Sequence, residues 1–174
     1  MPDKSIIDEL TVAVSRIYEH GLYYHIECGC IQSTGLGEVA QENFNILKKE
    51  LELLGGSGFA AVYLPFLTLL NGFTINGVTL FGLLNDENSI KDLRGARASL
   101  EAVPALYPTE FDHWVWVGET SLDVLIYNKQ SGFFEQRDRI ALDTCYEEPT
   151  TLQGLLIRLA DLLDSYRLSK DNPI

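Results

Sequence analysis

The residues best suited to chemistry lie in a glycine-rich stretch near the N-terminus. His25, Cys28 and Cys30 are spaced as His-x2-Cys-x-Cys, and imidazole and thiolate groups are ligands that zinc prefers. A structural zinc site needs four ligands, and the third cysteine, Cys145, lies far along the chain. We therefore expect no metal site, and we expect the two thiols to pack inside a loop.

Signatures of other catalytic sites do not occur. Gly55-Gly56-Ser57-Gly58 precedes an apolar helical segment, but Phe59-Ala60 stand where a phosphate-binding loop has Lys and Ser or Thr. The sequence has neither a Gly-x-Ser-x-Gly nucleophile motif nor a His-Glu-x-x-His zinc motif. Cys28 or Cys30 could pair with His113 only if the fold brought them together. We therefore expect that the protein is not an enzyme and needs no cofactor.

Four helices are expected to position these residues, because apolar residues recur at helical spacing in four segments. The segments are residues 5–20, 41–54, 59–70 and 150–166. Gly21 and the Gly55–Gly58 run should end the first two helices, and Pro65 should kink or split the third because proline lacks a backbone N–H. Residues 21–40 show no clear period and predict a loop, with one short strand at residues 23–28.

The second half of the chain predicts strands. They cover residues 78–83, 113–118, 123–127 and 133–137. The short polar loop Asn128–Gly132 favours a hairpin between the last two strands. Residues 85–110 predict a connection of mixed helix and loop. Residues 169–174 predict a frayed tail. This order predicts an α+β fold. We expect a single antiparallel sheet of about four to six strands, with N-terminal helices and a C-terminal helix packed against it. No boundary divides residues 1–174, which predicts one domain.

The charge of the chain bears on its partners. The 174 residues include 25 acidic and 13 basic ones, which gives a net charge of −12. This charge argues against nucleic acid, because phosphate binding needs clustered Lys and Arg. It would steer a basic protein toward the surface, although solubility alone would also explain an acidic composition.

The sequence also bears on location. The first ten residues, MPDKSIIDEL, lack the basic and apolar regions of a signal peptide. No apolar stretch approaches the roughly 20 residues of a membrane span, and three cysteines do not form a disulfide framework. We therefore expect a cytoplasmic protein that does not bind membranes.

Two kinds of surface residue are candidates for partner binding. Trp114 and Trp116 should share one face of a strand, where they form either part of the core or an exposed binding patch. Acidic residues near strand ends and before the last helix should lie on loops, where binding residues concentrate. These candidates are Asp86, Glu87, Glu119, Asp123, Glu147 and Glu148.

Residues 59–165 resemble a known family. The similar segments are Asn71-Gly72-Phe73, Asn76–Gly82, Trp116-Val117-Gly118, Asp123–Asn128, Ser131–Phe134, and Leu152, Leu155 and Leu156. This pattern of turn glycines and strand hydrophobics is similar to that of the SUKH superfamily, and is closest to its YrhA-like branch. The resemblance implies an α+β fold and a function as an immunity protein, which neutralises a cognate toxin, often a nuclease, by binding it.

Three functions remain open at this point. The first is an immunity-type protein that blocks a basic toxin domain. The second is a regulatory or scaffold module of the same fold that binds another cytosolic protein. The third is a small-molecule binder or enzyme that uses the loop at residues 21–39, and a deep pocket lined by His25, Cys28 and Cys30 would favour it. The oligomeric state does not follow from the sequence.

Overall fold

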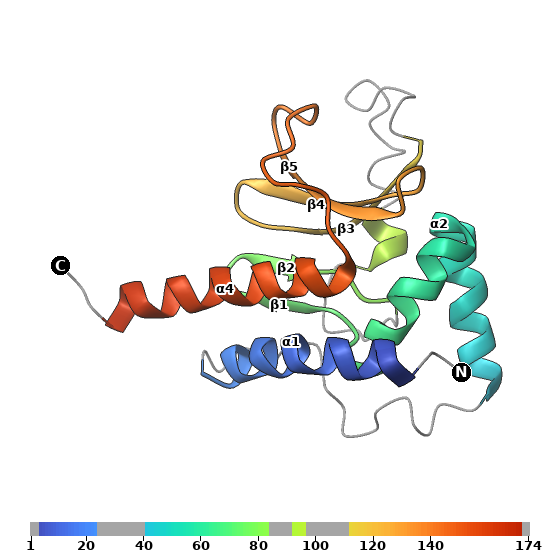
Figure 1. Ribbon diagram of the computed structural model, residues 1–174, viewed down its shortest axis with the longest axis horizontal. Helices are drawn as coiled ribbons and strands as arrows, with labels where there is room; N and C mark the ends of the chain where they lie inside the picture. Colours follow the sequence, from blue (N-terminus) through green and yellow to red (C-terminus); the bar gives the residue numbers. More distant parts are fainter. Residues whose placement is uncertain (1–3, 24–40, 84–91, 97–111, 172–174) are drawn as a thin grey trace.

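A computed structural model describes residues 4–23, 41–83, 92–96 and 112–171 (Figure 1). The helices are α1 (Lys4–Tyr23), α2 (Gln41–Leu69) and α4 (Leu152–Asp171), and Leu93–Ala96 form one further helical turn. The strands are β1 (Phe73–Ile75), β2 (Val78–Leu80), β3 (Trp114–Glu119), β4 (Asp123–Asn128) and β5 (Phe133–Asp138). His25, Cys28, Cys30, Asp86 and Glu87 lie outside the described residues, as does most of the predicted connection at 85–110.

The five strands form one antiparallel sheet in the order β1-β2-β3-β4-β5, so that each described strand pairs with its neighbour in sequence. Helices precede and follow the sheet. The predicted α+β class and the predicted antiparallel sheet are confirmed.

One face of the sheet packs against the helices. Alternate residues of a strand point to opposite faces, and the row Val115, Tyr127 and Phe134 belongs to the same buried cluster as the apolar faces of α1, α2 and α4. Aromatic rings reinforce this contact, because Phe59 of α2 lies 5.0 Å from Tyr127 between ring centroids. The Tyr63 hydroxyl, also on α2, donates to the Phe81 carbonyl at 2.7 Å.

Helices α1 and α4 lie side by side although they come from opposite ends of the chain (Figure 1). Their pairing is parallel, because early residues of α1 contact early residues of α4 and late ones contact late ones. Gln153 donates to the Glu9 carbonyl at 3.4 Å, and His20 Nε2 lies 3.0 Å from Asp164 Oδ1. Arg16 Nη2 lies 2.8 Å from Asp161 Oδ1 and also pairs with Asp164.

The helix ends differ from those predicted. Helix α1 continues through Gly21 to Tyr23, because glycine is permitted in helical conformation and ends a helix only where the chain turns left-handed. The segments predicted as two helices form α2, which is interrupted at Gly56 (φ 83°, ψ 176°) and not at Pro65. Helix α4 extends to Asp171, so the tail predicted to fray from residue 169 is helical as far as that residue.

Strand β1 was not predicted. It forms a two-residue hairpin with β2, in which Asn76 (φ 49°) and Gly77 (φ 82°) both have positive φ. Asn-Gly is the sequence that favours such turns. The Asn-Gly dipeptide was therefore the signal that could have identified a hairpin here, and with it the strand before the turn. Strand β2 in turn ends at Leu80 instead of Leu83.

The chain after β5 returns along the edge of the sheet. Phe134 and Thr150 exchange both backbone hydrogen bonds, at 2.7 and 2.8 Å, and Arg137 forms an isolated bridge with Cys145. Residues 144–150 therefore lie beside β5 and protect part of its edge, which would otherwise offer unpaired backbone groups.

Within the described residues, one helical segment, Phe44–Leu69, is long and apolar enough to cross a membrane by length and composition alone. The expectation that no apolar stretch approaches this length did not include it. Half of its apolar window is buried inside the protein, where Phe59, Tyr63 and Phe66 are fully covered. The segment is weak evidence for a membrane span, because the core helix of a globular domain has the same composition.

Candidate functional site

The acidic candidates at the turn between β3 and β4 are held by internal contacts. Glu119 is the last residue of β3, with a side chain 13% exposed, and its carboxylate lies 3.1 Å from the Arg139 guanidinium. Asp123 is the first residue of β4, and its carboxylate accepts from Thr120 Oγ1 at 3.0 Å and Gln136 Nε2 at 2.7 Å. The expectation that both lie on a loop is wrong, because each ends a strand and stabilises the turn between them.

The acidic pair before α4 is more accessible. Glu147 and Glu148 are exposed, and the carboxylate of Glu147 lies 2.8 Å from Arg158 Nε. Arg158 also donates to the Glu148 carbonyl at 3.0 Å. Glu148 is therefore an exposed residue on a segment whose backbone is anchored to α4.

A loop follows β5 and is organised by one carboxylate. Asp138 Oδ1 accepts from the backbone N–H of Ile140 at 2.6 Å and of Ala141 at 2.7 Å. The Tyr146 hydroxyl donates to the other oxygen of the same carboxylate. The hydrogen bond from Tyr146 and those from the two backbone groups lower the pKa of Asp138. At neutral pH this carboxylate is therefore ionised and holds both ends of the loop.

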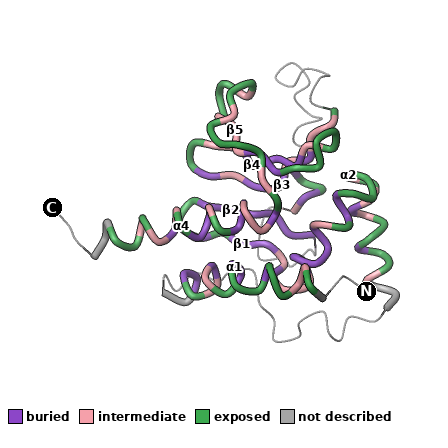
Figure 2. The backbone as a smooth tube through the Cα atoms, in the orientation of Figure 1, coloured by how far each residue is buried: buried purple, intermediate pink, exposed green. Residues whose placement is uncertain are grey.

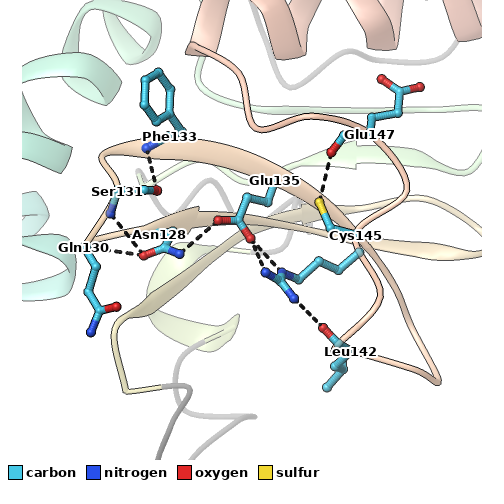
Figure 3. A network of polar contacts seen from close by, with 9 residues as sticks. Asn128, Gln130, Ser131, Phe133, Glu135, Leu142, Cys145 and Glu147 are labelled. Carbon is cyan, nitrogen blue, oxygen red and sulfur yellow. Dashed lines mark hydrogen bonds and ion pairs between the residues drawn. The ribbon is translucent and has the colours of Figure 1, made fainter.

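Behind this loop lies a network of polar groups around the buried Glu135 (Figure 3). Glu135, which is 4% exposed, accepts from Asn128 Nδ2 at 2.9 Å and from Arg137 Nε at 2.7 Å. Arg137 donates onward to the Leu142 carbonyl at 2.8 Å, and its guanidinium lies 4.3 Å from the centroid of Trp114. The network joins β3, β4 and β5 to the loop, so its first effect is to fix the position of that loop.

The two tryptophans lie on the same face of β3, as predicted. The register places Trp116 beside Ile126 and, through Ile126, in line with Glu135, on the face opposite to the helix-packing row. Both rings are half-buried. Trp116 packs against Phe81 and donates its indole N–H to the Gly118 carbonyl at 2.6 Å. Trp116 therefore belongs to the edge of the core, and Trp114 stacks under Arg137.

A second cluster of ionisable groups lies between α1 and α4. His20 is 3% exposed, and its Nε2 faces Asp164 while Nδ1 has no hydrogen-bond partner in the described part of the chain. The hydrogen bond from Arg16, with smaller contributions from His20, lowers the pKa of Asp164. This cluster ties two helices together, and its acidic partner is also paired with arginine, so the geometry indicates a structural role.

Within the described ranges, no group of three or more His, Cys, Asp and Glu side chains could hold a metal ion. Cys145 is partly exposed, and its thiol lies 3.0 Å from the Glu147 carbonyl. The metal and nucleophile hypotheses that involve His25, Cys28 and Cys30 concern residues outside those ranges.

Three exposed apolar side chains were not singled out by sequence reasoning. Leu122 is 75% exposed in the β3–β4 turn, Ile140 is 96% exposed after β5, and Tyr146 is 58% exposed in the same loop. Isolated apolar residues between strands carry no periodic signal, so the sequence offered nothing that marks them as surface residues.

Glycines that carry the SUKH resemblance occupy tight backbone crossings. A Cβ atom on Gly82 would lie 2.4 Å from the Asn71 carbonyl oxygen, and one on Gly118 would lie 2.3 Å from that of Thr79. Asn71 Oδ1 also accepts the backbone N–H of Leu83 at 3.0 Å. These motif residues therefore determine how β2 meets its neighbours, which is a property of the fold.

Comparison with protein-family models, with curated proteins and with solved structures finds no match to this chain. The resemblance to the SUKH superfamily therefore stays a prediction.

Proposed function

We propose that the protein is a non-catalytic binding domain of the cytoplasm that neutralises a basic protein partner, such as a nuclease-type toxin domain, by covering its surface. The observation that carries the proposal is the net charge of −12, which combines 25 acidic with 13 basic residues. A nuclease that holds phosphates needs clustered Lys and Arg. An acidic inhibitor complements such a surface and associates with it quickly.

The resemblance of residues 59–165 to immunity proteins supports this proposal independently of charge. The glycines behind the resemblance lie where a side chain would collide with backbone, at Gly82 and Gly118. Similarity at such positions reflects what the fold requires of the backbone. The specific function therefore has to come from the chemistry of the surface.

The test is capture of partners on the tagged, full-length protein in an extract of its native host at low salt. Bound proteins are eluted with a salt gradient and identified by mass spectrometry. We expect a small basic domain to elute late, because charge-driven association weakens as salt screens it. A second bait of equal negative charge but unrelated sequence controls for simple ion exchange.

If the basic protein appears on both baits, retention is non-specific and the proposal fails. If the bait retains only neutral or acidic cytosolic proteins, the regulatory or scaffold function replaces it.

A further inference from the structure

The end of the sheet formed by the β3–β4 turn and the loop after β5 exposes apolar side chains. Leu122, Ile140 and Tyr146 are 75%, 96% and 58% exposed. Figure 2 shows the loop after β5 as a largely exposed segment that projects from the sheet on the side away from α1. We call the surface made by these three residues with Asp143 and Glu147 the tip surface.

The two segments of the tip surface lie next to each other, because they are joined by hydrogen bonds. The Arg139 backbone N–H donates to the Leu122 carbonyl at 3.0 Å, which places the residue before Ile140 beside the turn. The Arg139 side chain also donates to the Thr120 carbonyl at 2.7 Å and pairs with Glu119. Leu122 and Ile140 therefore extend from adjacent, mutually anchored backbones.

The loop that carries Ile140 is preorganised. Asp138 accepts hydrogen bonds from the backbone of Ile140 and Ala141 and from the hydroxyl of Tyr146. Arg137, held by the buried Glu135, donates to the Leu142 carbonyl. A loop fixed at both ends loses little conformational freedom on binding, so an apolar side chain at its tip is well suited to serve as an anchor.

The surroundings of the tip surface are acidic. Residues 119–148 contain seven acidic and three basic side chains. Two of these basic residues are engaged internally, since Arg137 pairs with Glu135 and Arg139 with Glu119. The exposed acidic residues Asp143, Glu147 and Glu148 lie on this loop and on the segment that follows it, where Glu147 also pairs with Arg158. Acidic groups therefore border the apolar side chains, and we call these carboxylates the acidic rim.

We propose that the tip surface is the interface for the basic partner, with Ile140 inserted into an apolar pocket of that partner and its Lys and Arg side chains against the acidic rim. The inference rests on the proposed function for the existence of a basic partner. To that function it adds the location of the interface and the apolar side chain that anchors the partner. A second copy of this chain fits poorly, because it would bring an equally acidic rim against the first.

Photo-crosslinking in the native host tests the location. The photoreactive residue p-benzoylphenylalanine replaces Ile140 in the full-length chain, and a matched variant carries it at Leu53, which is 78% exposed on α2. We expect position 140 to crosslink to a basic protein and position 53 not to do so.

Each outcome of the crosslinking has a distinct meaning. A basic partner crosslinked only from position 53 overturns the tip surface and leaves the proposed function intact. A crosslink from position 140 to a second copy of the chain, or to an acidic protein, overturns the inference. The lack of any crosslinked partner from either position overturns the tip surface, and the salt-gradient capture then decides the proposed function.

Affinity measurements with the crosslinked basic protein, purified, test the anchor. Replacing Leu122 and Ile140 by Ser should raise the Kd at least tenfold, because central apolar anchors dominate binding. The control replaces two exposed apolar residues of the helices, Val12 and Leu53, by Ser and should change the Kd less than twofold. Equal effects of the two double variants overturn the anchor, and the melting temperature confirms that both variants are folded.

Discussion

At the scale of single residues, the buried Glu135 connects the sheet with the loop that it supports. A carboxylate that is 4% exposed is stable as an ion only when it is paired and hydrogen-bonded. Arg137 and Asn128 supply these contacts. Arg137 also donates to the Leu142 carbonyl and lies over the Trp114 ring. The Glu135–Arg137 ion pair is therefore linked to both the loop and β3.

Single substitutions in this pair should therefore be more harmful than the double substitution. Glu135→Leu leaves a largely buried guanidinium without its carboxylate, and Arg137→Met leaves the carboxylate without its cation. Each should lower the free energy of unfolding by about 3 kcal/mol. The loss of stability in the double variant should be well below the sum of the two single losses, because an apolar pair of similar volume replaces the ion pair. Urea unfolding of the unmodified protein, the two single variants and the double variant gives the coupling energy between the two side chains. If the two single losses simply add in the double variant, the side chains do not interact directly.

The candidate partner-binding residues show which features of a surface a sequence reveals. The acidic candidates Glu119, Asp123, Glu147 and Glu148 could be located near strand and helix ends. Their internal partners could not be predicted, because Arg139 and Arg158 reach them only through the pairing of strands and the docking of α4. Ile140 was overlooked for the same reason, since exposure depends on what the fold leaves uncovered.

At the scale of elements, Gly56 gives α2 its shape. Its backbone angles, φ 83° and ψ 176°, lie in a region that essentially only glycine occupies. Apolar residues on both sides of it, such as Leu51 before and Phe59 after, are buried in one core. The interruption therefore redirects the helix so that both halves reach the same interior.

Replacing Gly56 by Ala should destabilise the protein through backbone strain alone. A Cβ atom at this position would meet nothing within 4 Å, so no collision contributes. The expected loss is of order 1–3 kcal/mol, measured by thermal unfolding. Gly95→Ala is the matched control, because its Cβ would also meet nothing within 4 Å and its φ is not positive; an equal loss in both variants would argue against strain at Gly56.

Most elements could be predicted from the sequence, and the differences have local causes. Alternating residues indicated β3, β4 and β5 to within one residue. Strand β1 has three residues, too few for alternation to be recognised, although its Asn-Gly turn was visible. The helix end predicted at Gly21 and the split predicted at Pro65 do not occur, because the conformation of a glycine and the tolerance for a proline depend on what packs around them.

At the scale of the whole molecule, α1 and α4 join the two ends of the chain through charged side chains. Arg16 pairs with Asp161 and Asp164, and the buried His20 also faces Asp164. The pKa of Asp164 is lowered mainly by its hydrogen bond with Arg16. A carboxylate with a lowered folded-state pKa stabilises the fold above its unfolded pKa of about 4, and this stabilisation is lost as the pH falls through the folded pKa.

The pH dependence of stability should report this contact. Asp164→Asn removes the titrating group, so the melting temperature should fall less steeply on acidification below about pH 4 than in the unmodified protein. At neutral pH the variant should be less stable, and the difference should shrink in acid. Asp8→Asn, on the exposed side of α1, is the control. If the melting temperature of the Asp164 variant falls with pH as steeply as that of the unmodified protein, the Arg16–Asp164 pair contributes nothing to stability.

The parallel pairing of α1 and α4 has a consequence for synthesis on the ribosome. Glu9 and Gln153, which touch in the folded protein, are 144 residues apart. At translation rates of roughly 5–20 residues per second, the N-terminal helix waits about 7–30 s before its neighbour has been made. During this interval the apolar side chains of Leu10, Val14 and Ile17, all buried in the finished protein, lack part of their cover. The nascent chain is then a candidate client for chaperones that hold exposed apolar segments, and it is released from them when the last helix docks.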